Sequence, residues 1–353
     1  MSSLPRPKTS GSLAGGDRVQ RSIARPELVS AVVIAVAVLW GSTLGDGYTL
    51  TVAFNFVLLA SLGLGYTLVL GLGGLLVLNY PAFYATGAYV SAILMLRYDT
   101  SFLVAALTGA AAAAVIGLLV GLICLRFAGI YLAIVTLALG LSVNVVIRNL
   151  PLTGGANGLN GIPIPTIFGI TLDTALDFYY AALIFMIVVA AVVLAVKSSR
   201  FGLRLVATRD DRLAAETAGL NTVRTRLAAF MIGAIVAGIA GALLAVQQTA
   251  ISPNNFGVDQ TILILSIVVV GGLGSIPGTI IAAAIFTILP EFMNDLTRYE
   301  TLAFSILLLL VLLVRPQGLW PTRPVRGRSG THSRCEVVTA EPQELSVTEA
   351  GRP

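Results

Sequence analysis

The sequence predicts an all-α, polytopic membrane protein of about ten transmembrane helices, with eight as the lower alternative. Apolar residues make up 56% of the 353 residues and charged residues only 11%, whereas a soluble domain usually has about 25% charged residues. Apolar runs near or above the roughly 20 residues that cross a hydrocarbon core recur along the chain. Short polar breaks separate these runs, which is typical of a helical bundle and not of a β-barrel.

One transmembrane domain is expected over residues 28–316, between two polar tails. Residues 1–27 have no apolar core and residues 317–353 are rich in charged residues, so we expect both tails to be disordered and cytoplasmic. The expected apolar spans cover residues 28–45, 48–70, 81–96, 102–124, 130–147, 178–196, 227–248, 261–292 and 302–314.

Two glycine clusters interrupt this pattern. The cluster at residues 71–74 predicts a broken helix after the second span. The cluster at residues 271–274, with Pro277, predicts either two short helices or one re-entrant element within residues 261–292. Broken helices in corresponding halves of a transporter often mark the solute path and suggest an inverted repeat, although glycine clusters also serve close helix packing.

The distribution of Lys and Arg predicts the orientation. The N-terminal tail carries five, residues 197–226 carry seven and the stretch from Arg315 onward carries six, whereas the loop at residues 149–177 carries none. Because cytoplasmic segments carry the excess of positive charge, both tails and residues 197–226 are expected in the cytoplasm and the 149–177 loop outside. Both termini on one side require an even number of crossings.

The spans are nearly free of titratable side chains, which argues against several function classes. Proton-driven carriers usually keep carboxylates, Lys or His at bilayer depth, and the one histidine, His332, is in the C-terminal tail. No metal-ligand cluster, catalytic group or nucleic-acid surface is predicted. An energy source outside the membrane is the simpler hypothesis. The alternative is a self-sufficient secondary carrier or facilitator for a small neutral solute such as an amino acid or amide.

The charged segment at residues 199–219 is the place where such energy could enter. Thr208 and Asp211 have the spacing of a capping box, and Gly219 suits the position that ends a helix. We therefore predict a cytoplasmic helix of about ten residues. A solvated loop with ordinary cytoplasmic charge is the alternative. A nearly smooth surface formed by Leu213, Ala214 and Ala218 could fit into a groove of a partner protein.

Six segments of the chain resemble, in the same order, the permeases of bacterial ABC importers for branched-chain amino acids. They are LRFAGIYLAIVTLALG (125–140), TGGANGLNGIP (153–163), RDDRLAAETAGLN (209–221), ISPNNFG (251–257), VVVGGLGSIPG (268–278) and RPQGL (315–319). The resemblance implies an inner-membrane importer with two cytoplasmic ATPase subunits, a second permease that is related or identical, and a periplasmic solute-binding protein. The ATPases would bind ATP and magnesium, because this chain has no GxxxxGK[ST] phosphate loop. No cofactor and no enzymatic activity are expected in this chain.

The resemblance also implies roles for residues. It makes the 209–219 segment the coupling helix on which the ATPases dock. The coupling residues are Arg209, Asp210, Asp211, Ala214, Ala215, Glu216 and Gly219. Leu213 stands where importer permeases at large have Glu, so no single residue here takes that role.

A solute path is expected at the polar and glycine positions around the two helix breaks. Its candidate residues are Asn79, Tyr80, Gly71, Gly74, Gly271 and Gly274. Residues 74–80 read GLLVLNY, with Leu75 and Val77 at positions that are usually polar in the family. A lining as apolar as this one suits an aliphatic or small uncharged solute. The alternative is that this region only packs.

Overall fold

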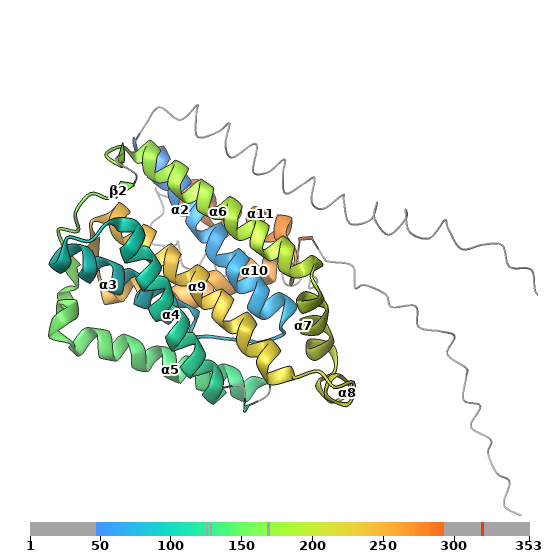
Figure 1. The fold of residues 1–353 in the computed structure, drawn as a ribbon. Coiled ribbons are helices and arrows are strands. Elements are labelled where there is room, and N and C mark those ends of the chain that lie inside the picture. The colour runs from blue at the N-terminus through green and yellow to red at the C-terminus, as the bar shows by residue number, and fades with distance from the viewer. Residues whose placement is uncertain (1–46, 125, 128, 168–169, 293–318, 321–353) are drawn as a thin grey trace, which may run out of the picture. The chain divides into compact units, whose positions relative to one another are not determined.

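Helices dominate the part of the chain that the computed structural model describes, residues 47–124, 126–127, 129–167, 170–292 and 319–320 (Figure 1). The α-helices are α2 (Gly47–Tyr66), α3 (Tyr80–Tyr98), α4 (Phe102–Cys124), α5 (Ile130–Asn149), α6 (Ala175–Ser198), α7 (Arg200–Asp210), α8 (Arg212–Thr217), α9 (Thr222–Gln248), α10 (Val258–Gly271) and α11 (Ile276–Phe292). A π-helix, η1 (Thr67–Leu72), continues α2, and the 3-10 turns are η2 (Pro151–Thr153), η3 (Gly155–Asn157) and η4 (Pro253–Phe256).

The structure confirms a polytopic helical membrane protein. Five described segments are long and apolar enough to cross a bilayer. They are Gly47–Leu72, Phe102–Cys124, Ile130–Asn149, Ala175–Ser198 and Thr222–Gln248. The shorter α10 and α11 are apolar as well. The expected first and last spans, like both tails, lie outside the described residues, so the number of crossings stays a prediction.

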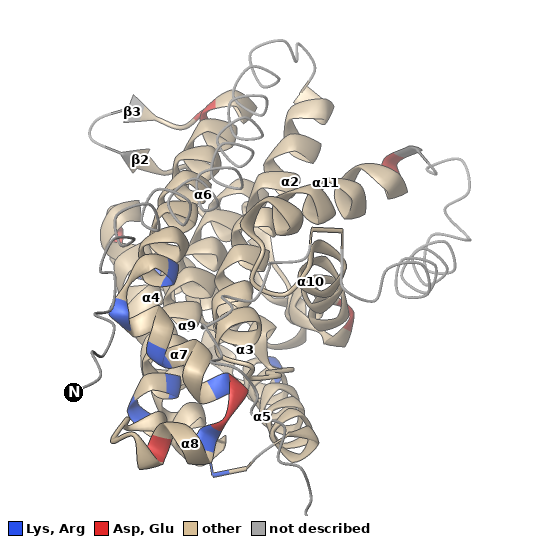
Figure 2. Cartoon of the chain, turned by 90° about the vertical axis from the view of Figure 1, so that its right-hand side faces the viewer, with Lys and Arg blue, Asp and Glu red and all other residues tan. Residues whose placement is uncertain are grey.

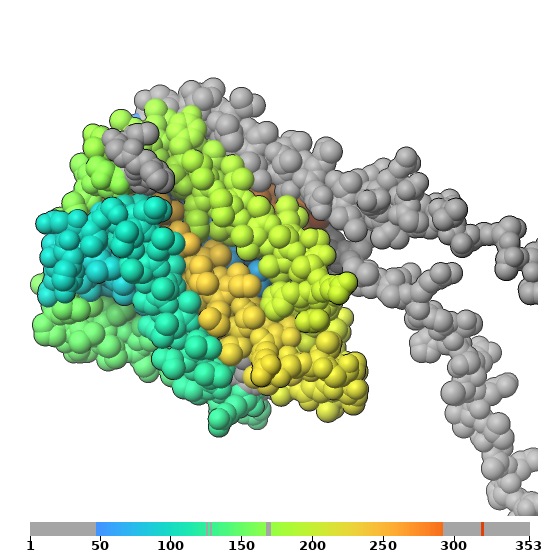
Figure 3. Space-filling view, viewed as in Figure 1, coloured from blue at the N-terminus to red at the C-terminus, as the bar shows by residue number. Residues whose placement is uncertain are grey.

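Helix α9 lies at the centre of the packing. It contacts α3, α4 and α2, and Figure 3 shows its side chains between those of α4 and α6. Small residues allow these close contacts, because a Cβ placed on Gly117 of α4 would lie 2.8 Å from the Cβ of Ala234 on α9. On the other side α2 packs against α6 and α11. Most residues of the apolar segment that could cross the bilayer are therefore buried in α2 and α9 (78% in each), whereas few are buried in α5 (22%).

Both helix breaks that the glycine clusters predict are present. After η1 the chain runs without helix through residues 73–79 before α3 begins, with Pro81 in its first turn. The second cluster separates α10 from α11, so residues 258–292 form two short helices. Bonds across the first break replace the missing helical ones, because the Tyr66 hydroxyl donates to the Val77 carbonyl at 3.0 Å. A backbone without helix is tolerated at membrane depth only when such partners satisfy it.

The described residues of the 149–177 loop make short local structures. Strand β1 (Leu159–Asn160) pairs antiparallel with β4 (Ala250–Ile251), which follows α9, and β2 (Thr166–Ile167) pairs with β3 (Ile170–Thr171). The Thr174 hydroxyl and the Asp177 carboxylate then form a capping box at the start of α6. The loop therefore ties the ends of α5, α6 and α9 together on one side of the bundle.

Candidate functional site

Residues 199–219 form two short helices, α7 and α8, and not one helix of about ten residues. Helix α8 starts after Asp211, whose carboxylate accepts the Ala214 N–H at 3.0 Å. The expectation that Thr208 is the N-cap was wrong, because Thr208 lies inside α7 and its hydroxyl donates to the Arg204 carbonyl at 2.7 Å. Asp211 is a strong N-cap in its own right, since its negative charge also favours the positive end of the helix.

Helix α8 ends where the sequence predicts. Gly219 has a φ of 80°, a left-handed conformation that glycine adopts without strain. Its N–H donates to the Glu216 carbonyl at 3.0 Å, and the Leu220 N–H donates to the Ala215 carbonyl at 3.0 Å. These two bonds are the Schellman motif, which satisfies the last carbonyls of a helix. The six residues of α8 are therefore capped at both ends.

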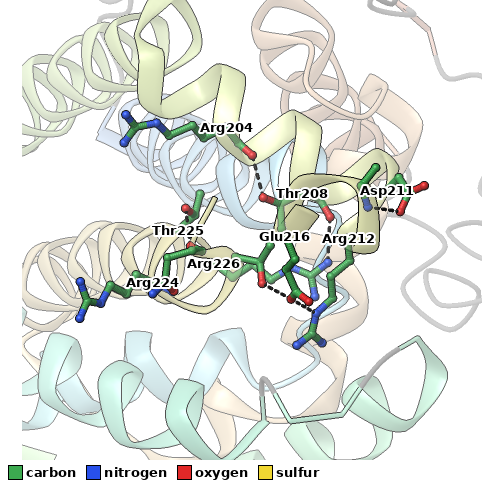
Figure 4. Close-up of polar contacts among 11 residues, drawn as sticks. Arg204, Thr208, Asp211, Arg212, Glu216, Arg224, Thr225 and Arg226 are labelled. Carbon is green, nitrogen blue, oxygen red and sulfur yellow. Dashed lines mark hydrogen bonds and ion pairs between the residues drawn. The ribbon is translucent and has the colours of Figure 1, made fainter. Parts of the chain in front are cut away.

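Side chains hold α8 against α7 and the start of α9 (Figure 4). The Arg212 guanidinium donates to the Glu216 carboxylate at 2.9 Å, and the Thr222 hydroxyl donates to the same oxygen at 2.7 Å. The Arg226 guanidinium donates to the Thr208 carbonyl at 3.0 Å. The hydrogen bond from Arg212, followed by that from Thr222, holds the pKa of Glu216 below its usual value.

The surface of α8 combines charge with one prominent apolar side chain. Figure 2 shows Lys and Arg gathered around α7 and α8. Leu213 is 75% exposed, the largest value among the exposed large apolar residues of the described chain. Ala215 is buried and faces the rest of the protein. The remaining predicted coupling residues are exposed: Arg209, Asp210, Asp211, Ala214, Glu216 and Gly219.

The end of α6 and the charged segment contact one glycine break each. The Arg209 guanidinium donates to the Gly71 carbonyl, and the Lys197 ammonium donates to the Gly274 carbonyl at 3.1 Å. Gly71 and Gly274 also meet each other, since a Cβ on Gly71 would lie 2.5 Å from the Gly274 nitrogen. The structure thus brings together the two glycine clusters and joins them to residues 197–210. A displacement of α7 would act on the first break through Arg209, and a displacement of the end of α6 would act on the second through Lys197.

The four predicted glycines differ in their surroundings. Gly71, Gly271 and Gly274 are buried, and a Cβ on Gly271 would lie 2.7 Å from the Gly278 carbonyl carbon. Gly74 is exposed and lies against the stem of Arg209, with its Cβ position 2.6 Å from the Arg209 Cγ. Gly71, Gly74 and Gly274 therefore lie where the breaks meet residues 197–210, whereas Gly271 packs against α11. A role of theirs in the solute path stays a prediction.

A cavity of about 200 Å³ lies between the first break, α5 and the start of α10. Its wall is mostly apolar and includes Leu78, Pro81, Leu137, Leu141, Phe256 and Val258. Four polar side chains also line it: Asn79, Asn144, Arg148 and Thr261.

Asn79 is the polar group whose hydrogen bonding is incomplete. Its side chain is 1% exposed, and neither the amide nitrogen nor the amide oxygen has a hydrogen-bond partner. A buried amide without partners costs about 1–3 kcal/mol in proteins. Such groups are rare in native structures, and both amide atoms are inaccessible to solvent, so Asn79 lines the cavity without presenting its amide to it.

The cavity lies near the middle of the membrane span of α5. The Leu78 N–H donates to the Thr136 hydroxyl at 3.0 Å. A Cβ on Gly140 would lie 2.8 Å from the Asn79 Cβ, and Gly140 is close to the centre of α5. Asn79 therefore stands at the depth where discontinuous helices of transporters usually bind their solutes.

Arg148 marks the other end of the cavity, near the 149–177 loop. Its Nε donates to the Asn144 side-chain oxygen at 2.9 Å and its Nη2 to the Asn254 side-chain oxygen at 2.6 Å. Both partners are neutral, and no described carboxylate lies within ion-pair distance of Arg148. Sequence reasoning missed Asn144 and Arg148. The available signal was their position: Gly140, Asn144 and Arg148 follow one another at intervals of four residues and so lie on one face of an apolar helix.

Tyr80 does not line the cavity, although the sequence places it beside Asn79. Its hydroxyl donates to the Gly233 carbonyl on α9 at 3.0 Å, and its ring packs against Tyr66 at 5.0 Å. Leu75 and Val77 are also buried in the core and are not part of the cavity wall. The apolar replacements in residues 74–80 therefore change the packing of the break more than the surface of the cavity.

Within the described ranges, no group of three or more His, Cys, Asp or Glu side chains could hold a metal ion. The chemistry available at the cavity is thus hydrogen bonding by amides and hydroxyls, attraction by one guanidinium, and apolar contact. The chemistry available at α8 is a small capped helix with an exposed leucine between charged groups.

Comparison with known proteins gives one family and several relatives. The family model described as "Branched-chain amino acid transport system / permease component" matches residues 48–315. The high-affinity branched-chain amino acid transport system permease protein LivM of Salmonella typhimurium is 35% identical over 250 residues, which are 64% of this chain and 58% of that protein.

Two further relatives cover smaller parts of the chain. The permease protein LivH of the same kind of transport system in Escherichia coli is 34% identical over 131 residues, 36% of this chain and 42% of that protein. The permease protein BraD of Pseudomonas aeruginosa is 32% identical over 146 residues, 40% of this chain and 47% of that protein. The chain thus spans about half the length of these relatives, from 42% to 58%. No solved structure matches it.

Proposed function

The chain belongs to the family of branched-chain amino acid transport permease components, and from this premise we propose that it is the transmembrane permease subunit of an ABC importer for a small amino acid, in particular a branched-chain one. Two partner ATPases would dock on the coupling helix and hydrolyse ATP. A second permease and a periplasmic solute-binding protein would complete the importer. The chain would lie in the bacterial inner membrane with both termini in the cytoplasm.

The observation that carries the ATPase part of the proposal is the construction of α8. A helix of six residues rarely stays folded alone, yet this one is capped at both ends and pinned by Arg212, Glu216 and Thr222. It holds Leu213 out at 75% exposure. A rigid short helix that presents one apolar side chain between charges fits insertion into a groove of a partner.

The contacts of α6 and α7 with the helix breaks support a route for the transmitted movement. Arg209 and Lys197 bond the carbonyls of Gly71 and Gly274, one at each helix break. A push on α8 and α7 would therefore reach the segment that carries Asn79. This arrangement favours an importer driven from the cytoplasm over a self-sufficient carrier.

The test is co-purification of the detergent-solubilised chain with its candidate ATPase. Leu213→Arg should abolish co-purification and ATP-driven uptake of radiolabelled leucine, because a longer, positively charged side chain replaces the apolar contact on the docking surface. Leu203→Arg is the matched control, since Leu203 is also exposed (60%) but lies on α7. Undiminished co-purification and uptake in Leu213→Arg would contradict the proposal. Uptake into proteoliposomes that hold the chain alone would favour a self-sufficient carrier instead.

A further inference from the structure

We infer that the outer face of α7, together with the first turn of α9, binds the phosphate groups of anionic phospholipids through three arginines, Arg200, Arg204 and Arg224. We call this surface the arginine face. The inference goes beyond the proposed function, because it involves no ATPase and requires only that α6 and α9 cross the bilayer.

The seven Lys and Arg side chains of residues 197–226 fall into two groups. Four of them donate hydrogen bonds within the protein, namely Lys197, Arg209, Arg212 and Arg226. The other three are exposed, and within the described residues their side chains have no hydrogen bond or ion pair: Arg200, Arg204 and Arg224. The first group holds α8 and the helix breaks in place, so the second group is the one that a ligand can reach.

The arginines of the second group lie on one side of the charged segment. Arg200 and Arg204 are four residues apart and therefore share one face of α7. Helix α7 packs against α9, which carries Arg224 in its first turn. In Figure 4 the guanidinium groups of Arg204 and Arg224 extend to the same side, away from the Glu216 carboxylate. Two neighbouring helices thus present their positive charges together.

The acidic side chains of the same segment lie elsewhere. Asp211 caps α8 and Glu216 forms an ion pair within α8. Asp210 follows Arg204 by six residues, which places it about 120° around the axis of α7. The charge of the arginine face is therefore not neutralised by its own segment, and the face attracts anions.

The position of the face beside two membrane spans favours a lipid over a soluble anion. Helix α6 is a candidate span that ends at Ser198, directly before α7, and α9 is a candidate span whose first turn holds Arg224. Arg204 follows Arg200 by one helical turn, about 6 Å along the axis. A guanidinium on its long stem reaches from there to the interface, and basic clusters next to the cytoplasmic end of a membrane helix attract anionic lipids.

The kind of cation favours a phosphate group. All three side chains of the arginine face are Arg and none is Lys. The planar guanidinium presents its donors as a fork that matches two oxygens of one phosphate, whereas an ammonium acts as a point charge. The ligand class is therefore a phospholipid with net negative charge, such as phosphatidylglycerol. Phosphatidylcholine fits less well, because its quaternary ammonium cancels the phosphate charge.

Thermal unfolding of the delipidated full chain in a neutral detergent tests the arginine face without any ATPase. Dioleoyl phosphatidylglycerol should raise the unfolding midpoint in a saturable way, because a ligand of the folded state stabilises that state. Dioleoyl phosphatidylcholine should not. The double variant Arg200→Gln, Arg204→Gln should need at least about tenfold more phosphatidylglycerol for half of the effect, since each arginine near a membrane surface strengthens binding about fivefold.

Two control variants separate the arginine face from charge and folding in general. Arg97→Gln removes the same charge from the exposed last turn of α3 and should respond as the wild type does. Arg97 precedes the start of α4, which is at the opposite end of the bundle, because Gly121 near the end of α4 lies against Leu227 near the start of α9. The double variant Arg200→Lys, Arg204→Lys keeps the charge and should also respond nearly as the wild type does.

Several outcomes would overturn the inference. Equal stabilisation by phosphatidylcholine would show that the lipid charge does not matter, and equal stabilisation by inorganic phosphate at the same concentration would show that a soluble anion suffices. An unchanged response of the Gln double variant would remove the arginines from the site. If that variant lost co-purification with the ATPase but responded to phosphatidylglycerol as the wild type does, the face would belong to a protein partner. None of these results depends on whether Leu213 docks an ATPase.

Discussion

The α8 helix and the cavity beside Asn79 differ in whether their polar side chains have hydrogen-bond partners. Around α8, the side chains of Asp211, Arg212, Glu216 and Thr222 all have partners close in the sequence. At the cavity, the Asn79 amide is buried without any partner. A satisfied network makes a rigid surface suited to a protein partner, whereas an unsatisfied buried group raises the free energy of the folded state. The two regions are joined by the contacts of Arg209 and Lys197 with the glycine breaks.

The junction between the two regions should be the most sensitive part. Gly71→Ala is expected to destabilise the protein by about 3 kcal/mol, because its Cβ would lie 2.5 Å from the Gly274 nitrogen. Unfolding in mixed micelles by a denaturing detergent measures this. Gly47→Ala is the matched control, since nothing lies within 4 Å of its Cβ position. Equal stability of the two variants would show that the breaks are not tightly packed against each other.

Replacing the unpaired amide should separate stability from transport. Asn79→Leu is expected to raise the free energy of unfolding by about 1–2 kcal/mol, because it removes a buried polar group that has no partner. The same variant should lose leucine uptake while its co-purification with the ATPase is unchanged. A lower unfolding free energy with normal uptake would mean that Asn79 only packs.

Removing the N-cap should loosen α8 alone. Asp211→Ala is expected to destabilise the helix by about 1 kcal/mol, because the Ala214 N–H loses its acceptor. Hydrogen exchange should become faster in residues 212–217, and co-purification with the ATPase should decrease. Asp210→Ala is the comparison, as Asp210 is exposed and is not the cap. Identical exchange in both variants would count against Asp211 as the functional cap.

Acidification should have the smallest effect. The hydrogen bond from Arg212 lowers the pKa of Glu216 from its ordinary value of 4.5, so the folded state binds a proton more weakly than the unfolded one. The stabilisation is therefore complete above pH 4.5 and is lost as the pH falls through the lower folded value. Exchange in α8 should rise slightly in that acidic window in the wild type but not in Glu216→Gln. The same rise in both would assign it to another group.

Sequence reasoning predicted the helical spans well because hydrophobic length is a local property. The expected span at 102–124 coincides with α4, and the ends of α5 and α9 differ from expectation only by short extensions. It also predicted the break at residues 71–74 and the cap at Gly219. It was wrong about the N-cap, because Thr208 and Asp211 are both good capping residues and only the backbone decides between them.

The cavity was only partly predictable. Asn79 attracted notice as a polar residue in an apolar segment, but its neighbour Tyr80 looked equally suited to the solute path. The structure turns Tyr80 toward α9 and leaves Asn79 against α5. Asn144 and Arg148 were not singled out, because their contacts with η4 involve residues more than one hundred positions away.

The sequence by itself determined that this protein is a helical membrane permease of a known family, where its helices lie, and that a charged segment interrupts them. These properties follow from hydrophobic length, glycine positions and motif order, which are read along the chain. Only the tertiary structure decided that the two glycine clusters meet, that Lys197 and Arg209 bond to them, and that the Asn79 amide is buried without a partner beside a cavity that Arg148 also lines. The physical reason is that close backbone approach and the pairing of buried polar groups depend on segments distant in sequence.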